Sequence, residues 1–211
     1  MGLPDVLVPS ATALLVIDMQ EAFFGPGALV PVHDRKGLCD RLRTTLTEFR
    51  NLGVRVIWTR VFMDETRAGV YPLLWPSHYD REGAPLLRKH GPLFPITADM
   101  RASVRPEDLM VDKPSFSAFF KTNLHSHLCR AGVRWLLHAG VVTNVCVEST
   151  LRDAFHLGYY PVLLSDCTRS INVELQRLCE SVIAMVFGFV APADEVASRL
   201  GRSPSPPTTT S

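Results

Sequence analysis

Apolar runs of strand length recur along the chain and alternate with segments of helical spacing. Strands that are apolar at nearly every position are typical of parallel sheets covered on both faces. The predicted strands are Thr12–Ile17, Val54–Thr59, Leu109–Val111, Val133–Val142, Tyr160–Ser165 and Val186–Val190. Such a series of buried strands strongly limits the folds that are open to the chain.

Apolar residues three or four positions apart predict the helices that separate these strands. In Arg35–Asn51, for example, Leu38, Leu42 and Leu46 share one face. The predicted helices are Arg35–Asn51, Leu124–Ala131, Val145–Leu157, Asn172–Met185 and Ala193–Leu200. The alternation predicts an α/β chain with a three-layer α/β/α, Rossmann-like fold around a parallel sheet of about six strands.

Two segments do not follow this alternation of strands and helices. Phe62–Arg105 contains five prolines and is too long for a plain connection, which predicts a functional loop or flap with a little helix. Gly201–Ser211 is polar and rich in proline, which predicts disorder. We therefore expect a single domain over residues 1–200 and a disordered tail over residues 201–211.

Charge and cysteine content restrict the partners that we expect. The formal net charge is +1 and no Lys/Arg-rich run is present, which argues against nucleic acid or a membrane as a partner. The apolar N-terminal stretch has no basic region before it and soon meets Asp18, as expected for a buried strand rather than a signal peptide. The five cysteines show no CxxC pair, which favours reduced thiols in a cytoplasmic protein.

Cys146 lies where the fourth predicted strand gives way to a helix. The free backbone N–H groups of a first helical turn favour an anion, so a thiol there can become a nucleophile. Gly140 and Thr143 permit a tight turn that directs N–H groups to one point, as an oxyanion hole requires. The alternative is a buried, inert cysteine.

Asp18 and Lys113 follow the first and third predicted strands, and the carboxyl ends of parallel strands meet at one edge of a sheet. Asp18 is a candidate general base for the thiol of Cys146, and Lys113 a cation that stabilises the thiolate. The alternatives are a capping carboxylate and a solvated loop lysine.

Three blocks, LLVIDMQEAFF, DKPSFSAFF and GVVTNVCVESTLRDAFHLGY, together resemble the isochorismatase-like cysteine hydrolases over roughly residues 10 to 195. The third block is most similar to the ureidoacrylate, biuret and N-carbamoylsarcosine amidohydrolases of that superfamily. The resemblance implies a strand order of 3-2-1-4-5-6 and a catalytic triad of Asp18, Lys113 and Cys146. It also implies a cis peptide at Val142–Thr143 and a homodimer or homotetramer, in which a neighbouring subunit could complete the pocket.

The resemblance implies cleavage of a C–N bond in a small amide, carbamoyl or ureido substrate. The thiolate of Cys146 attacks the substrate carbonyl, and backbone N–H groups of Thr143 and Cys146 stabilise the oxyanion. Ammonia is released as the thioester intermediate forms. No cofactor is expected.

Departures from the family pattern narrow the expected chemistry. Nicotinamidases carry an Asp-x-His pair for a metal after the second strand, whereas this chain has WTRVFMDETRAG there. His78 and His90 are isolated and are interpreted as solvent-facing loop residues, so we predict no metal and disfavour nicotinamide. Cys146 argues against isochorismatase chemistry, because true isochorismatases lack this cysteine. Glu21 replaces the family's usual asparagine after the aspartate motif.

The substrate-binding candidates are Phe23, Arg60, Phe116 and Asn144, which lie near strand ends or within the motif blocks. Arg60 has the chemistry to hold a substrate carboxylate or ureido oxygen through two hydrogen bonds, with a surface salt bridge as the alternative. The phenylalanines suit a planar amide, but an aromatic residue beside a strand is also a common core residue.

Three other functions stay open at this point. The first is a catalytically silent binding or scaffold domain with the same fold, and the second is a nicotinamidase-like amidase. The third, a thiol redox protein, is disfavoured because no CxxC pair or evident resolving cysteine is present.

Overall fold

The computed structural model describes residues 2–5, 7–63 and 70–200. The tail that the sequence predicts to be disordered, residues 201–211, lies outside the described residues. None of the helices in the described ranges combines the length and the apolar character needed to cross a membrane.

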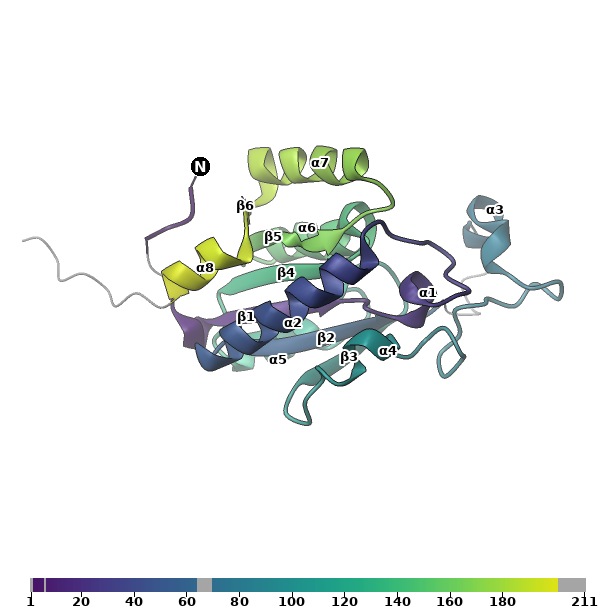
Figure 1. Cartoon of the computed structure of the whole chain (residues 1–211), viewed down its shortest axis with the longest axis horizontal. Helices are drawn as coiled ribbons and strands as arrows, with labels where there is room; N and C mark the ends of the chain where they lie inside the picture. Colours follow the sequence, from purple (N-terminus) through teal and green to yellow (C-terminus); the bar gives the residue numbers. More distant parts are fainter. Residues whose placement is uncertain (1, 6, 64–69, 201–211) are drawn as a thin grey trace, which may run out of the picture.

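Six strands form one sheet in which every neighbouring pair is parallel. The strands are β1 Thr12–Ile17, β2 Arg55–Val61, β3 Leu109–Lys113, β4 Trp135–Val141, β5 Tyr160–Arg169 and β6 Phe189–Ala191. Their order is β3-β2-β1-β4-β5-β6, which confirms the predicted fold class and the strand order that the resemblance implied (Figure 1).

Burial explains why β1 is apolar at every position after Thr12. Every residue of β1 is buried, because this strand lies at the centre of the sheet between β2 and β4. Successive side chains of a strand point to opposite faces. Leu14 and Val16 accordingly belong to one hydrophobic cluster, and Leu15 and Ile17 to the other.

Helices cover both faces of the sheet. Residues of α2 Arg35–Asn51 and α8 Ala193–Leu200 belong to the cluster of Leu14, and Figure 1 shows these two helices crossing the same face. Residues of α5 Leu124–Arg130, α6 Glu148–His156 and α7 Val173–Val182 belong to the cluster of Leu15. The arrangement is therefore the three-layer α/β/α architecture.

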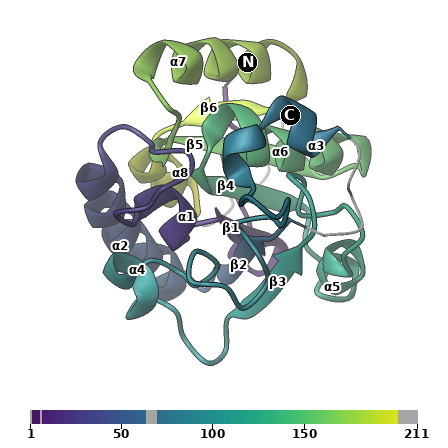
Figure 2. The same ribbon diagram turned by 90° about the vertical axis from the view of Figure 1, so that its right-hand side faces the viewer.

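Three short helices lie outside the layers. They are α1 Glu21–Phe24, α3 Tyr71–Leu74 and α4 Ala98–Arg101. A 3-10 turn, Pro76–His78, follows α3, so the described part of the long segment, residues 62–63 and 70–105, contains little helix. Figure 2 looks onto the edge where the strands end, with α1 and α3 in front of the sheet.

Two predicted helices begin or end differently. A π-helical turn, Thr143–Val147, precedes α6, and a second one, Ile183–Phe187, follows α7. Strand β5 also continues to Arg169, beyond the predicted end at Ser165. Its polar residues there interrupt the apolar pattern from which the strand was predicted, although backbone pairing continues at Thr168 and Arg169.

Candidate active site

Asp18, Lys113 and Cys146 converge at the carboxyl edge of the sheet. Asp18 directly follows β1, Lys113 is the last residue of β3, and Cys146 lies in the π-helical turn after β4. Their exposed fractions are 0%, 0% and 3%, so the group is closed off from bulk water. Burial rules out the alternative of a solvated loop lysine at position 113.

Lys113 is held at a fixed point by one ion pair and two hydrogen bonds. Its Nζ lies 2.6 Å from Oδ2 of Asp18 and donates hydrogen bonds to the carbonyl oxygens of Ser115 at 3.0 Å and Phe116 at 2.8 Å. Two of the three ammonium hydrogens are therefore donated to backbone carbonyls. The positive charge is therefore positioned beside the carboxylate.

Asp18 is oriented by the neighbouring strand. The hydroxyl of Thr59 donates to Oδ1 of Asp18 at 2.7 Å, and the Asp18 N–H points back to the Thr59 carbonyl oxygen at 3.2 Å. The backbone of Asp18 has a φ of 52°, a left-handed conformation that aspartate tolerates better than most residues. Among the described residues Oδ2 makes no hydrogen bond of normal geometry, although Lys113 lies close to it. This oxygen keeps a lone pair for a proton.

The turn that carries Cys146 is fixed by a threonine one helical turn later. Thr150 donates its hydroxyl to the Cys146 carbonyl oxygen at 2.7 Å and accepts the N–H of Ala118 at 3.0 Å. The same hydroxyl thus joins the cysteine turn to the segment that follows Lys113. This link fixes the position of the Cys146 turn relative to the segment that follows Lys113.

Burial raises the pKa of the Cys146 thiol above its ordinary value. The Lys113 charge acts to lower this pKa, and the Asp18 charge acts to raise it. Burial thus favours the protonated thiol, and a nucleophilic sulfur in this setting requires a base that removes the proton. Asp18, the predicted general base, is one of the two charged residues that act on this thiol.

The cis peptide bond near the turn lies at a different position from the one that we expected. The cis peptide joins Val141 and Val142, so its prediction at Val142–Thr143 was wrong by one residue. Strand β4 ends at Val141, and the chain changes direction there rather than at the threonine. The N–H groups of Val145 and Val147 both donate to the Val142 carbonyl oxygen. They are engaged within the turn, and Thr143 and Cys146 stay the predicted oxyanion donors.

A cavity of about 380 Å³ opens beside Cys146. Phe23 and Phe116 line it, as their positions after β1 and β3 led us to expect. Segment 62–105 supplies further wall residues, which are Met63, Trp75, His78 and Leu87. The remaining lining residues are Ala22, Leu29, Val30, Pro31, Val61, Val142, Val145 and Ile171.

Arg60 and Asn144 are not among the residues that line this cavity. Arg60 donates from Nε to Oδ1 of Asp112 at 2.8 Å and lies over the ring of Phe94, 4.5 Å from its centroid. Asn144 accepts the hydroxyl of Ser170 at 2.5 Å through its own Oδ1. The salt bridge that we gave as the alternative for Arg60 is therefore the one present.

His78 was wrongly interpreted as solvent-facing. It is half-buried, lines the cavity and stacks on Trp75 with ring centroids 6.2 Å apart. Burial lowers the pKa of His78, and a hydrogen bond with the backbone of Leu29 acts in the opposite direction. His90, by contrast, is exposed as expected. No periodicity surrounds His78, so its sequence carried no signal of burial.

Thr59, which donates a hydrogen bond to Asp18, is a residue of the candidate site that sequence reasoning missed. It ends the predicted strand Val54–Thr59, and it lies opposite Ile17 in the pairing of β1 with β2. The sequence did carry a signal for this residue, because a hydroxyl side chain ends the strand that was predicted to lie next to the one that precedes Asp18.

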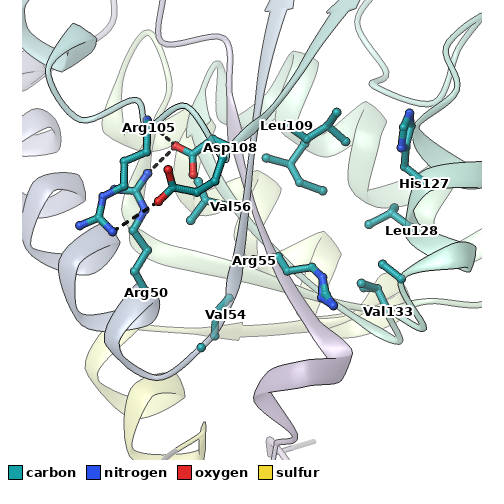
Figure 3. Close-up of a pocket in the computed structure, with 14 residues that line it drawn as sticks. Arg50, Val54, Arg55, Val56, Arg105, Asp108, Leu109, His127, Leu128 and Val133 are labelled. Atoms are coloured by element: carbon teal, nitrogen blue, oxygen red, sulfur yellow. Dashed lines mark hydrogen bonds and ion pairs between the residues drawn. The ribbon is translucent and has the colours of Figure 1, made fainter.

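A second cavity, of about 470 Å³, lies at the opposite edge of the sheet (Figure 3). It is lined by residues at the amino ends of β2 and β3, including Arg55 and Leu109. Arg50 and Asp108 form an ion pair of 2.5 Å at its wall, and the Arg105 N–H donates to the same carboxylate at 2.9 Å. This larger cavity has no nucleophilic side chain among its lining residues, so size alone does not identify the active site.

Within the described ranges, no cluster of three or more His, Cys, Asp or Glu side chains is arranged to hold a metal ion. The metal-free site remains a prediction. All five cysteines are unpaired thiols, and Cys129 is the exposed one.

Comparison with known proteins places these features in a family. Residues 12–195 match the isochorismatase domain. The ureidoacrylate amidohydrolase RutB of Agrobacterium fabrum is 32% identical over 214 residues, which cover 91% of each chain. The corresponding protein of Rhizobium rhizogenes is 30% identical over 222 residues, 95% of this chain and 87% of that one.

Solved structures show the same architecture. A cysteine hydrolase from Pseudomonas syringae pv. phaseolicola superposes with a TM-score of 0.82 at 28% identity and covers 95% of this chain and 98% of that one. The N-carbamoylsarcosine amidase of Thermoplasma acidophilum has a TM-score of 0.69 at 20% identity, with 87% of this chain and 96% of that one covered. At that identity the second likeness concerns the fold alone.

Proposed function

The chain belongs to the isochorismatase family, and we propose that it is a cysteine-dependent amidohydrolase that cleaves the C–N bond of a small amide, carbamoyl or ureido compound and releases ammonia. The observation that carries this proposal is the buried pair of Asp18 and Lys113, 2.6 Å apart, beside a cysteine on the wall of a cavity. The similar proteins named as amidohydrolases support the same reaction class.

The first half of the reaction forms a thioester. Asp18 takes the proton of the Cys146 thiol, and the sulfur attacks the substrate carbonyl carbon. Backbone N–H groups of Thr143 and Cys146 stabilise the oxyanion. The C–N bond then breaks as protonated Asp18 gives its proton to the leaving nitrogen, and ammonia departs.

The second half returns the enzyme to its starting state. Asp18 accepts a proton from a water molecule, and the resulting hydroxide oxygen attacks the thioester carbon. The C–S bond breaks, the sulfur takes the proton back from Asp18, and the acid product leaves. The net reaction is one amide and one water to one acid and one ammonia.

Lys113 has an electrostatic role throughout. When Asp18 is neutralised by the thiol proton, the ammonium group faces the thiolate instead of the carboxylate, so the site never holds an unpaired buried charge. Its two carbonyl contacts, to Ser115 and Phe116, keep it in place during the exchange. An ion held without reorganisation stabilises developing charge more effectively than solvent does.

Variants of Cys146 test the proposal. We expect Cys146→Ala and Cys146→Ser to lower ammonia release from a panel of small amides and ureas by about 10³-fold or more. Rapid quenching of the wild type followed by mass spectrometry should detect an acyl group on Cys146. Cys129→Ser, which changes the exposed thiol, serves as the matched control and should be fully active. Undiminished ammonia release by Cys146→Ala would refute the cysteine mechanism, whereas no ammonia release by the wild type from any of these substrates would favour the silent scaffold.

A further inference from the structure

The cavity beside Cys146 has walls made almost wholly of carbon. Its aliphatic and aromatic surfaces come from segments that lie far apart in the sequence, the ends of β1 and β2, the segment 62–105 and the stretch after β5. Besides the thiol, His78 is the one titratable side chain among the described lining residues. A site of this composition recognises a substrate mainly through buried apolar surface.

The arginine and lysine side chains near the cavity form ion pairs with carboxylates of the protein itself. Arg60 is bound to Asp112, and Lys113 is bound to Asp18 and two backbone carbonyls. Arg169, which precedes the wall stretch after β5, pairs with Asp34 at 2.9 Å. No arginine or lysine among the described residues lines the cavity. A carboxylate that entered it would lose its hydration without gaining a partner charge from any of the described residues, which is strongly unfavourable.

His78 does not supply that charge near neutral pH. Burial lowers its pKa, and its ring stacks on Trp75, which in turn meets the ring of Phe116 edge-on at 5.6 Å. The neutral imidazole thus forms part of an aromatic wall that faces the substrate.

We infer that the preferred substrate is an uncharged primary amide with an apolar acyl group, and that acyl groups ending in a carboxylate are excluded. The inference rests on the proposed amidohydrolase function and narrows its substrate class. It separates this chain from the similar ureidoacrylate amidohydrolases, whose named substrate carries a carboxylate. The cavity of about 380 Å³ is at the small end of the range for ligand sites, which suits an acyl chain of a few carbons or one ring.

A matched pair of substrates tests the inference on the wild-type enzyme. 4-Methylpentanamide and succinamate have the same backbone length, and an isopropyl group in the first replaces the carboxylate of the second. We expect kcat/KM for the neutral amide to be higher by about 100-fold or more, and to rise about fourfold per methylene from propanamide to hexanamide. Equal or faster hydrolysis of succinamate would overturn the inference and leave the amidohydrolase function intact.

A variant at the cavity mouth tests the cause. Ile171 lines the cavity and is 47% exposed, so a longer polar side chain fits there without entering the core. Ile171→Lys should shift the preference toward succinamate by about tenfold, because a lysine supplies the missing partner charge. Ile171→Gln is the uncharged control for the loss of apolar wall surface, and its shift toward succinamate should be clearly smaller than that of Ile171→Lys. An unchanged preference in the lysine variant would count against the inference.

Alkylation of Cys146 provides a readout that does not depend on turnover. N-Hexyl iodoacetamide and iodoacetate both form a C–S bond and release iodide and a proton, but only the second carries a carboxylate. Labelling of Cys146, normalised to the exposed Cys129 in the same molecule, should favour the neutral reagent by about tenfold or more. Ammonia release from none of the amides would count against the proposed function, and this labelling ratio would still decide the inference. A ratio near one would overturn it.

Discussion

Nζ of Lys113 lies 2.6 Å from Oδ2 of Asp18, and neither side chain has any exposure to solvent. Two opposite charges that leave water together must satisfy each other and their remaining hydrogen-bonding groups. Here the two backbone carbonyls after β3 accept hydrogen bonds from the Lys113 ammonium group, and the Thr59 hydroxyl donates one to the Asp18 carboxylate. The pair therefore fixes the geometry of the site, and loss of either partner leaves a buried, uncompensated charge.

Lys113→Met removes the cation and keeps a side chain of similar length. We expect the free energy of unfolding to fall by about 3–5 kcal/mol, because the Asp18 carboxylate is left without its counter-ion. Activity should fall by about 10²-fold or more, since the thiolate and the oxyanion lose a positioned charge. Urea unfolding and an ammonia assay measure the two effects.

A double variant separates stability from catalysis. Asp18→Asn combined with Lys113→Met removes both charges, and asparagine tolerates the left-handed backbone at position 18. We expect the double variant to recover much of the stability that Lys113→Met loses, yet to stay inactive. An active double variant would contradict the role of Asp18 as base. Failure to recover stability would contradict the assignment of the loss to an unpaired charge.

Thr59→Val tests the hydroxyl that orients Asp18. Valine has nearly the same shape, but its methyl group cannot donate to Oδ1, which now receives a hydrogen bond of 2.7 Å. A hydrogen bond to a charged group contributes about 1.5–3 kcal/mol, so we expect a comparable loss of stability and a fall in kcat of about tenfold to 100-fold. Thr59→Ser keeps the hydroxyl and should retain most of the activity. Equal activity of the two variants would show that the carboxylate needs no such support.

The sequence was sufficient to predict five of the six strands and the convergence of the triad, whereas the predicted strand Val186–Val190 begins within the π-helical turn and overlaps β6 Phe189–Ala191 at two residues only. Each buried strand has a strong apolar pattern, and parallel strands bring their carboxyl ends to one edge. The position of a charged residue that directly follows such a strand, as Asp18 does, can therefore be predicted without knowing how any loop folds. The catalytic roles, the oxyanion donors, the homo-oligomer and the cytoplasmic location stay predictions.

Side-chain partners within the pocket could not be predicted in the same way. Arg60 lies opposite Asp112 in the pairing of β2 with β3, and this cross-strand contact turns it away from the cavity. His78 lies on the cavity wall together with Phe23 and Phe116, which follow β1 and β3, and no periodic pattern in residues 70–105 encodes that placement. Substrate specificity depends on these contacts, which are set by tertiary packing.

Gln20→Met tests how segment 62–105 is attached to the sheet. The Gln20 amide donates to the carbonyl oxygens of Val61 and Phe94, and its own oxygen accepts the Val61 N–H at 2.7 Å. Methionine fills the space but leaves these buried backbone groups unpaired, at about 1–3 kcal/mol for each. We expect KM to rise by about tenfold with a smaller change in kcat, because the cavity wall shifts while the triad stays in place.

Glu21→Gln is the matched control for the Gln20 variant. The Glu21 carboxylate accepts the Ala98 N–H at 2.8 Å, and a glutamine oxygen can accept the same bond. Kinetic constants should change little, apart from loss of the weak contact with Arg101 at 3.8 Å. A rise in KM as large as that of Gln20→Met would show that the effect is not specific to the buried amide.

His138 makes the stability of the protein depend on pH. The ring is fully buried within β4, where Nδ1 contacts the Val162 carbonyl oxygen at 3.3 Å and Nε2 has no partner among the described residues. Burial lowers the pKa of His138 from 6.5 to about 4. Between these values the unfolded chain binds a proton that the folded chain does not, so stability falls as pH falls through this window.

The difference between 6.5 and about 4 corresponds to about 3 kcal/mol, present in full above pH 7 and lost as the pH approaches 4. His138→Asn keeps a donor near the position of Nδ1 and removes the titration. Urea unfolding at pH 8 and pH 4.5 should show a fall in the free energy of unfolding that is larger in the wild type than in this variant by about 2 kcal/mol or more. Equal falls in both proteins would mean that other groups, such as the paired carboxylates, account for the acid sensitivity.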